Sequence, residues 1–374
     1  MEFTAPKRDL LALVSQAQGA SDKKSAMPIL ANVLLTANSG RLHVTATDLY
    51  LGVTGSCNVE VMHPGNLALP AKDLLDRIKM MPDGPIQIIE RENNSATVKA
   101  VGAARRYTVH GMPGSEFPKL PEVVAGSPTL ELATSVLAQL IAQTHFSVST
   151  DETRAHVNSA LFEWAGDIVR MVTTDGHRLS KMEVKLDGKH ESTQMLVPLR
   201  ALHELKRLVD GARGVDTIRI QQSGATAFFH IGDMLFSLKT VDAQFPPYQQ
   251  VIPSYVHVDL KVPRGALADA VRAVSIAASD RTGGVKLTLE NGMLRVTSES
   301  PESGNGFDEV PVDAPEGAAK LVVGMNAKYL QDVLGALADD EVTIGMSGEL
   351  DPITVRQLDT NKRNNVYVVM PMRV

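Results

Sequence analysis

The sequence has few of the residues that build disulfides and metal centres. Its 374 residues include a single cysteine, Cys57, which excludes an intrachain disulfide and a cysteine metal cluster. No apolar run approaches the roughly 20 residues of a membrane-spanning helix. Charged residues occupy the amino-terminal stretch where a secretory signal peptide has its apolar segment. These absences predict a cytoplasmic protein.

The motifs of several enzyme classes are also missing. The chain has no phosphate-binding loop, no dinucleotide fingerprint, no His-Glu-x-x-His zinc motif and no Gly-x-Ser-x-Gly nucleophile motif. The strongest catalytic candidate is Asp175-Gly176-His177-Arg178 with Ser180 nearby, but adjacency in sequence does not give the geometry of a triad. A β-turn accounts for Asp175 and Gly176 and leaves His177 and Arg178 unexplained. We therefore expect no catalytic residue, metal or cofactor; an enzyme that uses Asp175 and His177 is the alternative.

The negative net charge limits how this protein can bind nucleic acid. Lysine and arginine number 37 against 43 aspartates and glutamates, a net charge of −6. A negative chain repels phosphate, so contact with DNA requires a locally basic surface. The composition, 44% hydrophobic and 21% charged, is that of an ordinary globular protein.

One short pattern recurs along the chain. Leu42–Asp48, Met171–Asp175 and Leu294–Glu299 each read as an apolar strand that ends in hydroxyl residues and an acid. The terminal acids are 127 and 124 residues apart. Self-similarity at a fixed period indicates repeated structural units. The period divides the chain into three domains, residues 1–125, 126–253 and 254–374.

Each copy reads as two halves, and each half as a helix with strands. Apolar residues at helical spacing predict helices at 7–18, 72–81, 264–277 and from Asn326 onward, with weaker ones around 136–141 and 202–209. In the second copy, alternating patterns predict strands at 156–164, 168–174 and 180–186. The predicted fold class is α+β, three tandem copies that make six helix-plus-sheet half-units.

A row of such units leaves unpaired strands at its ends. Exposed strand edges invite uncontrolled pairing, and a head-to-tail dimer would bury them and close a ring. The candidate edges are Arg105–Gly111 and Ile276–Glu299, which carry opposite charges. An open three-domain rod, a scaffold that never meets DNA, is the alternative. The interface residues that the ring predicts are Arg105, Tyr107, Val109, Ile276, Glu299 and Glu302.

Basic residues lie on several predicted helices, while much of the acid lies on strands and loops. Helices that faced a common channel would give it a mildly positive lining suited to sequence-independent phosphate contact. Solvated helix faces are the alternative. The candidate DNA-facing residues on helices are Lys72, Arg77, Lys79, Arg200, Lys206 and Arg207.

The sequence ends on apolar residues, where most chains end on polar ones. Pro371 ends the last predicted strand and leaves Met370, Met372 and Val374 as an apolar tail. Methionine is favoured on surfaces that accept varied partners. The alternative is a tail folded into the local core.

Four motifs are spread over the whole chain: Pro28-Ile29-Leu30-Ala31-Asn32, Thr174-Asp175-Gly176-His177-Arg178-Leu179, Phe245-Pro246-Pro247-Tyr248 and Val366-Tyr367-Val368-Val369-Met370-Pro371-Met372-Arg373. In this order they resemble one protein family, the β subunit of bacterial DNA polymerase III or sliding clamp. The resemblance implies a homodimeric ring of six half-units around double-stranded DNA, with helices inside, that acts as a processivity factor without catalysis. Lys24 matches a basic loop position of the family and joins the DNA-facing candidates.

The resemblance also implies a peptide-binding groove between the second and third copies. There the polymerase III catalytic subunit, the clamp loader and repair polymerases would dock short linear peptides. Gln250 stands where many relatives have arginine and Thr282 where an aromatic can occur, which predicts a less charged and shallower groove. Matched by position, the groove residues are Val157, Thr174, Gly176, His177, Arg178, Leu179, Pro246, Val251, Asn326, Tyr329, Leu350, Met370, Pro371, Met372 and Arg373.

Overall fold

The computed structural model describes residues 1–279, 282–301, 303–315, 317–357 and 363–373. The chain divides into two compact units, each defined by the contacts within it. Unit 1 comprises Met1–Leu137 and His203–Thr240, and unit 2 comprises Ala138–Leu202 and Val241–Val374. The middle third of the sequence therefore contributes to both units, each of which has its own sheets and core.

Unit 1 contains two antiparallel sheets. The strands at one end of the larger sheet come from the first copy and those at the other end from the second. The two sets join where β4 pairs with β16, from Leu51↔Leu238 to Gly55↔Met234. The five-stranded sheet has the order β5 (Glu60–His63), β1 (Glu2–Pro6), β7 (Pro85–Arg91), β8 (Ser95–Ala100) and β9 (Arg106–His110). The nine-stranded sheet has the order β10 (Met112–Pro113), β6 (Gly65–Pro70), β2 (Asn32–Asn38), β3 (Arg41–Thr47), β4 (Leu51–Asn58), β16 (Met234–Lys239), β15 (Thr226–Ile231), β14 (Thr217–Ser223) and β11 (Thr129–Ala133).

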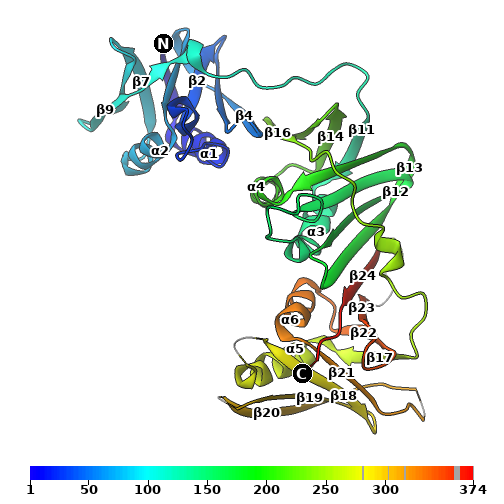
Figure 1. The fold of residues 1–374 in the computed structure, drawn as a ribbon. Coiled ribbons are helices and arrows are strands. Elements are labelled where there is room, and N and C mark those ends of the chain that lie inside the picture. The colour runs from blue at the N-terminus through cyan, green and yellow to red at the C-terminus, as the bar shows by residue number, and fades with distance from the viewer. Residues whose placement is uncertain (280–281, 302, 316, 358–362, 374) are drawn as a thin grey trace. The chain divides into compact units, whose positions relative to one another are not determined.

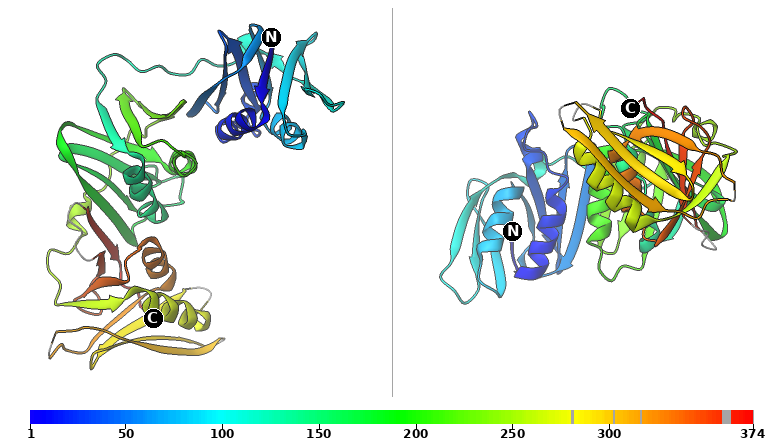
Figure 2. Two further views of the ribbon diagram at one scale, coloured as in Figure 1. Left: turned by 180° about the vertical axis from the view of Figure 1, so that it is seen from behind. Right: turned by 90° about the horizontal axis from the view of Figure 1, so that it is seen from below.

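Helices α1 (Lys7–Gln18) and α2 (Ala71–Met80) pack against each other, as the two views in Figures 1 and 2 show. Both bury the apolar stripe that the sequence predicts, and α1 has the predicted bounds. Its Leu13 lies so close to β4 that a Cβ on Gly55 would come within 2.6 Å of the leucine Cδ2. Full burial of each such leucine contributes on the order of 2 kcal/mol.

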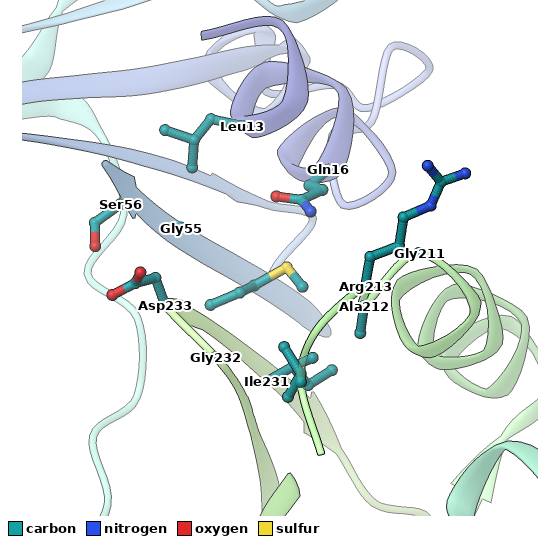
Figure 3. A pocket seen from close by; sticks show the side chains of 12 residues that line it. Leu13, Gln16, Gly55, Ser56, Gly211, Ala212, Arg213, Ile231, Gly232 and Asp233 are labelled. Atoms are coloured by element: carbon teal, nitrogen blue, oxygen red, sulfur yellow. The ribbon is translucent and has the colours of Figure 1, made fainter. Parts of the chain in front are cut away.

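A small cavity lies beside this contact in unit 1. It is lined by Leu13 and Gln16 of α1, by Gly55 of β4 and by the turn at Gly232 and Asp233 (Figure 3). Its volume of about 170 Å³ is below the roughly 300 Å³ at which small-molecule sites begin. The cavity therefore offers no ligand site of ordinary size.

Unit 2 also contains two antiparallel sheets, with helices α5 (Arg264–Val274) and α6 (Ala327–Ala336) packed side by side (Figure 2). Their buried faces, including Leu267, Val271, Leu330 and Leu334, form one apolar core with the strands. The six-stranded sheet has the order β12 (Ser159–Thr174), β13 (Arg178–Pro198), β24 (Arg363–Val369), β23 (Ile353–Gln357), β22 (Glu341–Met346) and β17 (Val258–Pro263), and the four-stranded sheet β20 (Gly304–Pro311), β19 (Met293–Ser300), β18 (Gly284–Glu290) and β21 (Leu321–Asn326).

The remaining helices are short or divided between the units. Neither these nor the longer helices of the described residues could cross a membrane, because none is both long and apolar enough. Their bounds are α3 (Thr134–Ala142), α4 (Leu199–Asp210) and the 3₁₀ turns η1 (Pro28–Ala31), η2 (Gly114–Glu116), η3 (His145–Ser147), η4 (Tyr248–Gln250) and η5 (Ser275–Ala277).

Three predictions about elements were wrong in detail. The two strands predicted at 156–164 and 168–174 are one strand, β12, because Gly166 (φ +60°) forms a bulge with shifted register and not a turn. The strand predicted at 180–186 is the start of β13, which continues to Pro198. The helix predicted at 264–277 ends at Val274 and tightens into η5.

The predicted edge Ile276–Glu299 was also wrong. That range contains β18, which lies between β19 and β21, and most of β19, which lies between β18 and β20. The outer strand beyond β19 is β20, Gly304–Pro311. Its glycine and acidic residues gave no alternating apolar pattern that would have marked it as a strand. The other predicted edge is correct, since β9 is the last strand of its sheet.

Candidate peptide-binding site

The motif that recurs in the sequence forms a tight turn between β12 and β13. Asp175 Oδ1 accepts hydrogen bonds from the backbone N–H groups of His177 (2.9 Å) and Arg178 (3.0 Å). Thr174 Oγ1 donates to the Arg178 carbonyl (2.7 Å) and accepts from the Gly176 N–H (3.1 Å). Gly176 has a φ of +95°, which glycine adopts without strain. Thr174, Asp175 and Gly176 thus each have a structural reason for their identity.

The first copy contains the same turn between β3 and β4. Thr47 Oγ1 donates to the Leu51 carbonyl (2.6 Å) and accepts from the Leu49 N–H (2.9 Å). Asp48 Oδ1 accepts from the N–H groups of Tyr50 (2.8 Å) and Leu51 (2.6 Å). Leu49 has a φ of +77°, in the region that Gly176 occupies in the second copy. The repeat inferred from sequence is therefore a repeat of hydrogen bonds as well.

Arg178 joins this turn to α6. Its Nε donates to Asp175 Oδ2 (3.0 Å), its Nη1 to Asp332 Oδ2 (2.6 Å) and its Nη2 to the Phe146 carbonyl (2.5 Å). The guanidinium lies over the Tyr329 ring at 4.4 Å, a favourable cation–π geometry. Two carboxylates face one cation, so Arg178 presents little unbalanced charge.

The carboxyl-terminal residues lie along the same turn. Met370 N donates to the His177 carbonyl (2.9 Å), and Met372 N donates to the Gly324 carbonyl (2.8 Å). The His177 ring stacks on Tyr329 with centroids 6.5 Å apart. The pKa of Tyr329 is raised, mainly by burial and further by the negative charge of Asp175. The backbone of the tail is therefore fixed, while the Met370 side chain is exposed.

Three apolar groove candidates are exposed: Val251 (41%), Leu350 (76%) and Met370 (38%). Val157 and Leu179, by contrast, are each 1% exposed, so their side chains belong to the core beneath. We call the residues from Thr174 to Arg178, with Tyr329, Val251, Leu350 and residues 370–373, the peptide surface.

The remaining residues predicted for the groove differ in their surroundings. Asn326 accepts from Lys328 N (2.9 Å) and so caps α6, and its Nδ2 donates to the Thr282 carbonyl. Pro246 lies half-buried just before η4, Pro371 and Met372 are half-buried, and Arg373 is exposed.

Sequence reasoning missed three contributors. Arg154 donates to the Asp175 carbonyl (3.2 Å), with its Nη2 3.5 Å from where a Cβ on Gly176 would lie. Asp332 holds Arg178 from α6, and Phe245 packs on the core below Leu179. Phe245 was considered only as part of the motif Phe245-Pro246-Pro247-Tyr248 and not as a groove residue, and nothing in one sequence marks Arg154 or Asp332.

Asp175 and His177, the residues of the enzyme alternative, are not arranged for catalysis. Both Asp175 oxygens are engaged, Oδ1 by the turn and Oδ2 by Arg178, and the His177 ring stacks on Tyr329. Among the described residues no group of three or more histidines, cysteines, aspartates or glutamates could hold a metal ion.

The predicted DNA-facing residues differ in their surroundings. Lys24, Lys72, Lys79 and Arg200 are exposed. The other three form ion pairs on their own helices, Arg77 with Asp73 (3.2 Å), Lys206 with Asp210 (2.6 Å) and Arg207 with Glu204 (2.5 Å).

The predicted interface residues are also unequal. Arg105 donates to the Met80 carbonyl, Tyr107 is half-buried, and Val109 is 2% exposed, so that Val109 offers only its backbone at the edge. Ile276 is 82% exposed, and Glu299 lies on β19 opposite Asn305. Glu302 lies outside the described residues. Phe307 on the true edge strand β20 is 63% exposed and was missed.

The chain resembles known proteins over its whole length. Family models of the DNA polymerase III beta subunit match in chain order: the N-terminal domain over residues 1–121, the central domain over 131–247 and the C-terminal domain over 249–373. A beta sliding clamp of Pseudomonas putida is 31% identical, and that of Escherichia coli K12 is 29% identical, with 100% of each chain covered.

Solved structures of sliding clamps are similar to this chain as well. A sliding clamp from Pseudomonas aeruginosa bound to griselimycin has a TM-score of 0.93 at 31% identity, with 100% of both chains covered. The DNA polymerase III beta subunit of Thermotoga maritima has a TM-score of 0.92 at 27% identity, covering 100% of this chain and 99% of that one.

The fold first defines a class, a protein of three tandem α+β domains. The domain models and the relatives then identify the family. The chain belongs to the DNA polymerase III β subunit family, the bacterial β sliding clamps. It is a DNA sliding clamp, a processivity factor and not an enzyme.

Proposed function

We propose that two copies of this chain close head to tail into a ring that encircles double-stranded DNA in the cytoplasm. The observation that carries the proposal is that β9 of the first copy and β20 of the third each lie at the end of a sheet. Exposed edges of this kind require a partner. The ring would contain six domains from two chains, each divided at residues 1–125, 126–253 and 254–374.

The DNA contact would be weak and independent of sequence. The net charge of −6 and the local pairing of Arg77, Lys206 and Arg207 leave few cations for phosphate. A ring holds DNA by topology, so weak contacts suit sliding. Lys24, Lys72, Lys79 and Arg200 are the exposed cations that we assign to the channel.

The peptide surface would tether partners. Together with the turn fixed by hydrogen bonds, exposed Val251, Leu350 and Met370 would give an apolar site with oriented polar edges, which suits a short linear peptide. The polymerase III catalytic subunit, the clamp loader and repair polymerases are the partners that we assign to it. The Pseudomonas aeruginosa clamp has been solved bound to griselimycin, which supports the expectation that griselimycin binds this chain too.

Two measurements test the ring. Native mass spectrometry should give twice the chain mass of 40.2 kDa. The loaded protein should remain on circular DNA and be lost from the same DNA after it is linearised, because only free ends let a ring slide off. Equal loss from both forms would overturn the proposal.

A further inference from the structure

Within unit 1, the Arg207 guanidinium links helix α4 of the second copy to helix α1 of the first copy. Glu204 on α4 is 8% exposed and pairs with Arg207 three residues later. The Arg207 Nη2 also donates to the Gln16 carbonyl (2.6 Å), at the carboxyl end of α1. The arginine thus joins an acid of one copy to the free carbonyls that end a helix of the preceding copy.

The equivalent arrangement exists within unit 2, with a different arginine. Asp332 on α6 is 128 residues after Glu204. Its Oδ2 accepts from Arg178 Nη1, whose Nη2 donates to the Phe146 carbonyl in η3, just after α3. The acid keeps its place, the accepting carbonyl lies beyond the helix in η3 and not within it, and the guanidinium now comes from the turn of the peptide surface.

The turn itself does not need an arginine. Leu51 holds the place of Arg178 in the first copy, pairing with Leu238 as Arg178 pairs with Val369. Lys239 N donates to the Tyr50 carbonyl (2.9 Å) as Met370 N does to that of His177 (2.9 Å). The hydrogen bonds that Thr174 Oγ1 and Asp175 Oδ1 make in the turn are all reproduced in the first copy with leucine in this place. Arg178 must therefore serve something beyond the turn.

We infer that the Arg178–Asp332 ion pair positions the peptide surface, and that Asp332 is a positioning residue for partner binding. This inference rests on the proposed peptide binding. The pair holds together the turn, the Tyr329 ring at 4.4 Å from the guanidinium, and η3. Its side chains are 10% and 15% exposed, so little water competes with the ion pair. Arg178 then acts on a peptide through the shape of the surface, because two carboxylates already balance its charge.

Without the ion pair, the residues of the peptide surface should spend part of the time in other positions when no peptide is bound. A site that is competent only part of the time binds with an apparent affinity reduced by that fraction. Asp332→Asn keeps the size of the side chain and removes its charge. We expect it to weaken binding about tenfold. Arg178→Leu, which introduces the residue of the first copy, should weaken binding to a similar extent.

The experiment is titration calorimetry with griselimycin as the probe at 25 °C, with the melting temperature of each variant measured alongside. The double variant Arg178→Leu/Asp332→Asn should bind no more weakly than the poorer single variant, since both remove one interaction. Asp332→Glu keeps the charge and should recover part of the affinity. Lys328→Ala is the matched control, because Lys328 also pairs with Asp332 but is 72% exposed; it should stay within about twofold of the parent chain.

The outcomes separate the two proposals. A parent chain that does not bind griselimycin would contradict the peptide surface itself. A parent chain that binds, with Asp332→Asn equally tight, would overturn the positioning role alone, and so would a lower melting temperature with unchanged affinity. Additive losses in the double variant would also overturn it, because they would mean that the two residues act separately.

Discussion

Gly19 lies against the Glu204 carboxylate, and a Cβ at Gly19 would overlap both carboxylate oxygens. Gly19 follows α1 with a φ of −62°, which any residue can adopt. The requirement for glycine is therefore steric and comes from the second copy. The absence of one methyl group lets Glu204 and Arg207 reach the end of α1.

Gly19→Ala should destabilise the protein by about 3 kcal/mol, because it displaces a buried carboxylate from its partner. Gly265→Ala on α5 is the control, since a Cβ there meets nothing within 4 Å and alanine favours a helix by up to about 1 kcal/mol. Calorimetric melting of both variants checks this. A melting temperature for Gly19→Ala equal to that of the parent would show that the carboxylate moves aside freely.

Cys57 should react slowly with thiol reagents. Burial is the largest cause that raises its pKa from 9.0 to about 11, and the thiolate is the reactive form. At pH 8, below both values, the thiolate fraction should be about 100-fold smaller than at the unperturbed pKa, as one pKa unit is tenfold. The rate should rise with pH up to about 11. A plateau near pH 9 in the rate of reaction with a disulfide reagent would contradict the shift.

Much of the fold follows from local chemistry. The buried stripe of α1, the prolines before α2 and α4, and the Thr-Asp turns all depend on neighbours in sequence, so the period of the repeat could be recognised. The bulge at Gly166 could not, because a glycine with positive φ serves a turn and a bulge equally well. Nor could β20, whose place in a sheet is determined by β19 and not by its own pattern.

The candidate site shows the same division. Thr174, Asp175 and Gly176 could be interpreted from sequence because their hydrogen bonds stay within the turn. Asp332 lies 154 residues from Arg178 in the sequence, and no local sequence pattern indicates that the two residues form an ion pair. Arg207 looked like a DNA contact from its place on a helix, yet its hydrogen bonds serve α1 and Glu204.

Deletion of residues 370–374 should abolish peptide binding and leave the dimer intact. The deletion removes exposed Met370 and the backbone bonds to His177 and Gly324, but no part of β9 or β20. We expect at least a 100-fold loss of affinity for griselimycin by calorimetry, with an unchanged native mass. Met370→Ala, which keeps the backbone, should lose less. Unchanged affinity in the deletion would remove the tail from the peptide surface.

Ile276→Asp with Phe307→Asp should convert the dimer to monomers. These side chains are 82% and 63% exposed beside the edge strand β20, and burying two carboxylates in an apolar contact without partners is strongly unfavourable. We expect the dimer dissociation constant from sedimentation equilibrium to rise at least 100-fold. Retention on circular DNA should fall to that on linear DNA, because an open chain cannot enclose the duplex.

The matched control for this pair is Tyr255→Asp. Tyr255 is also an exposed large side chain (71%) of unit 2, but it lies in the connector before β17, away from the edge strand in sequence and pairing. A general loss of solubility or folding would affect both variants alike, whereas a disrupted edge-to-edge contact affects only the first. If Ile276→Asp/Phe307→Asp stays dimeric while Tyr255→Asp becomes monomeric, the strand that closes the ring is not β20.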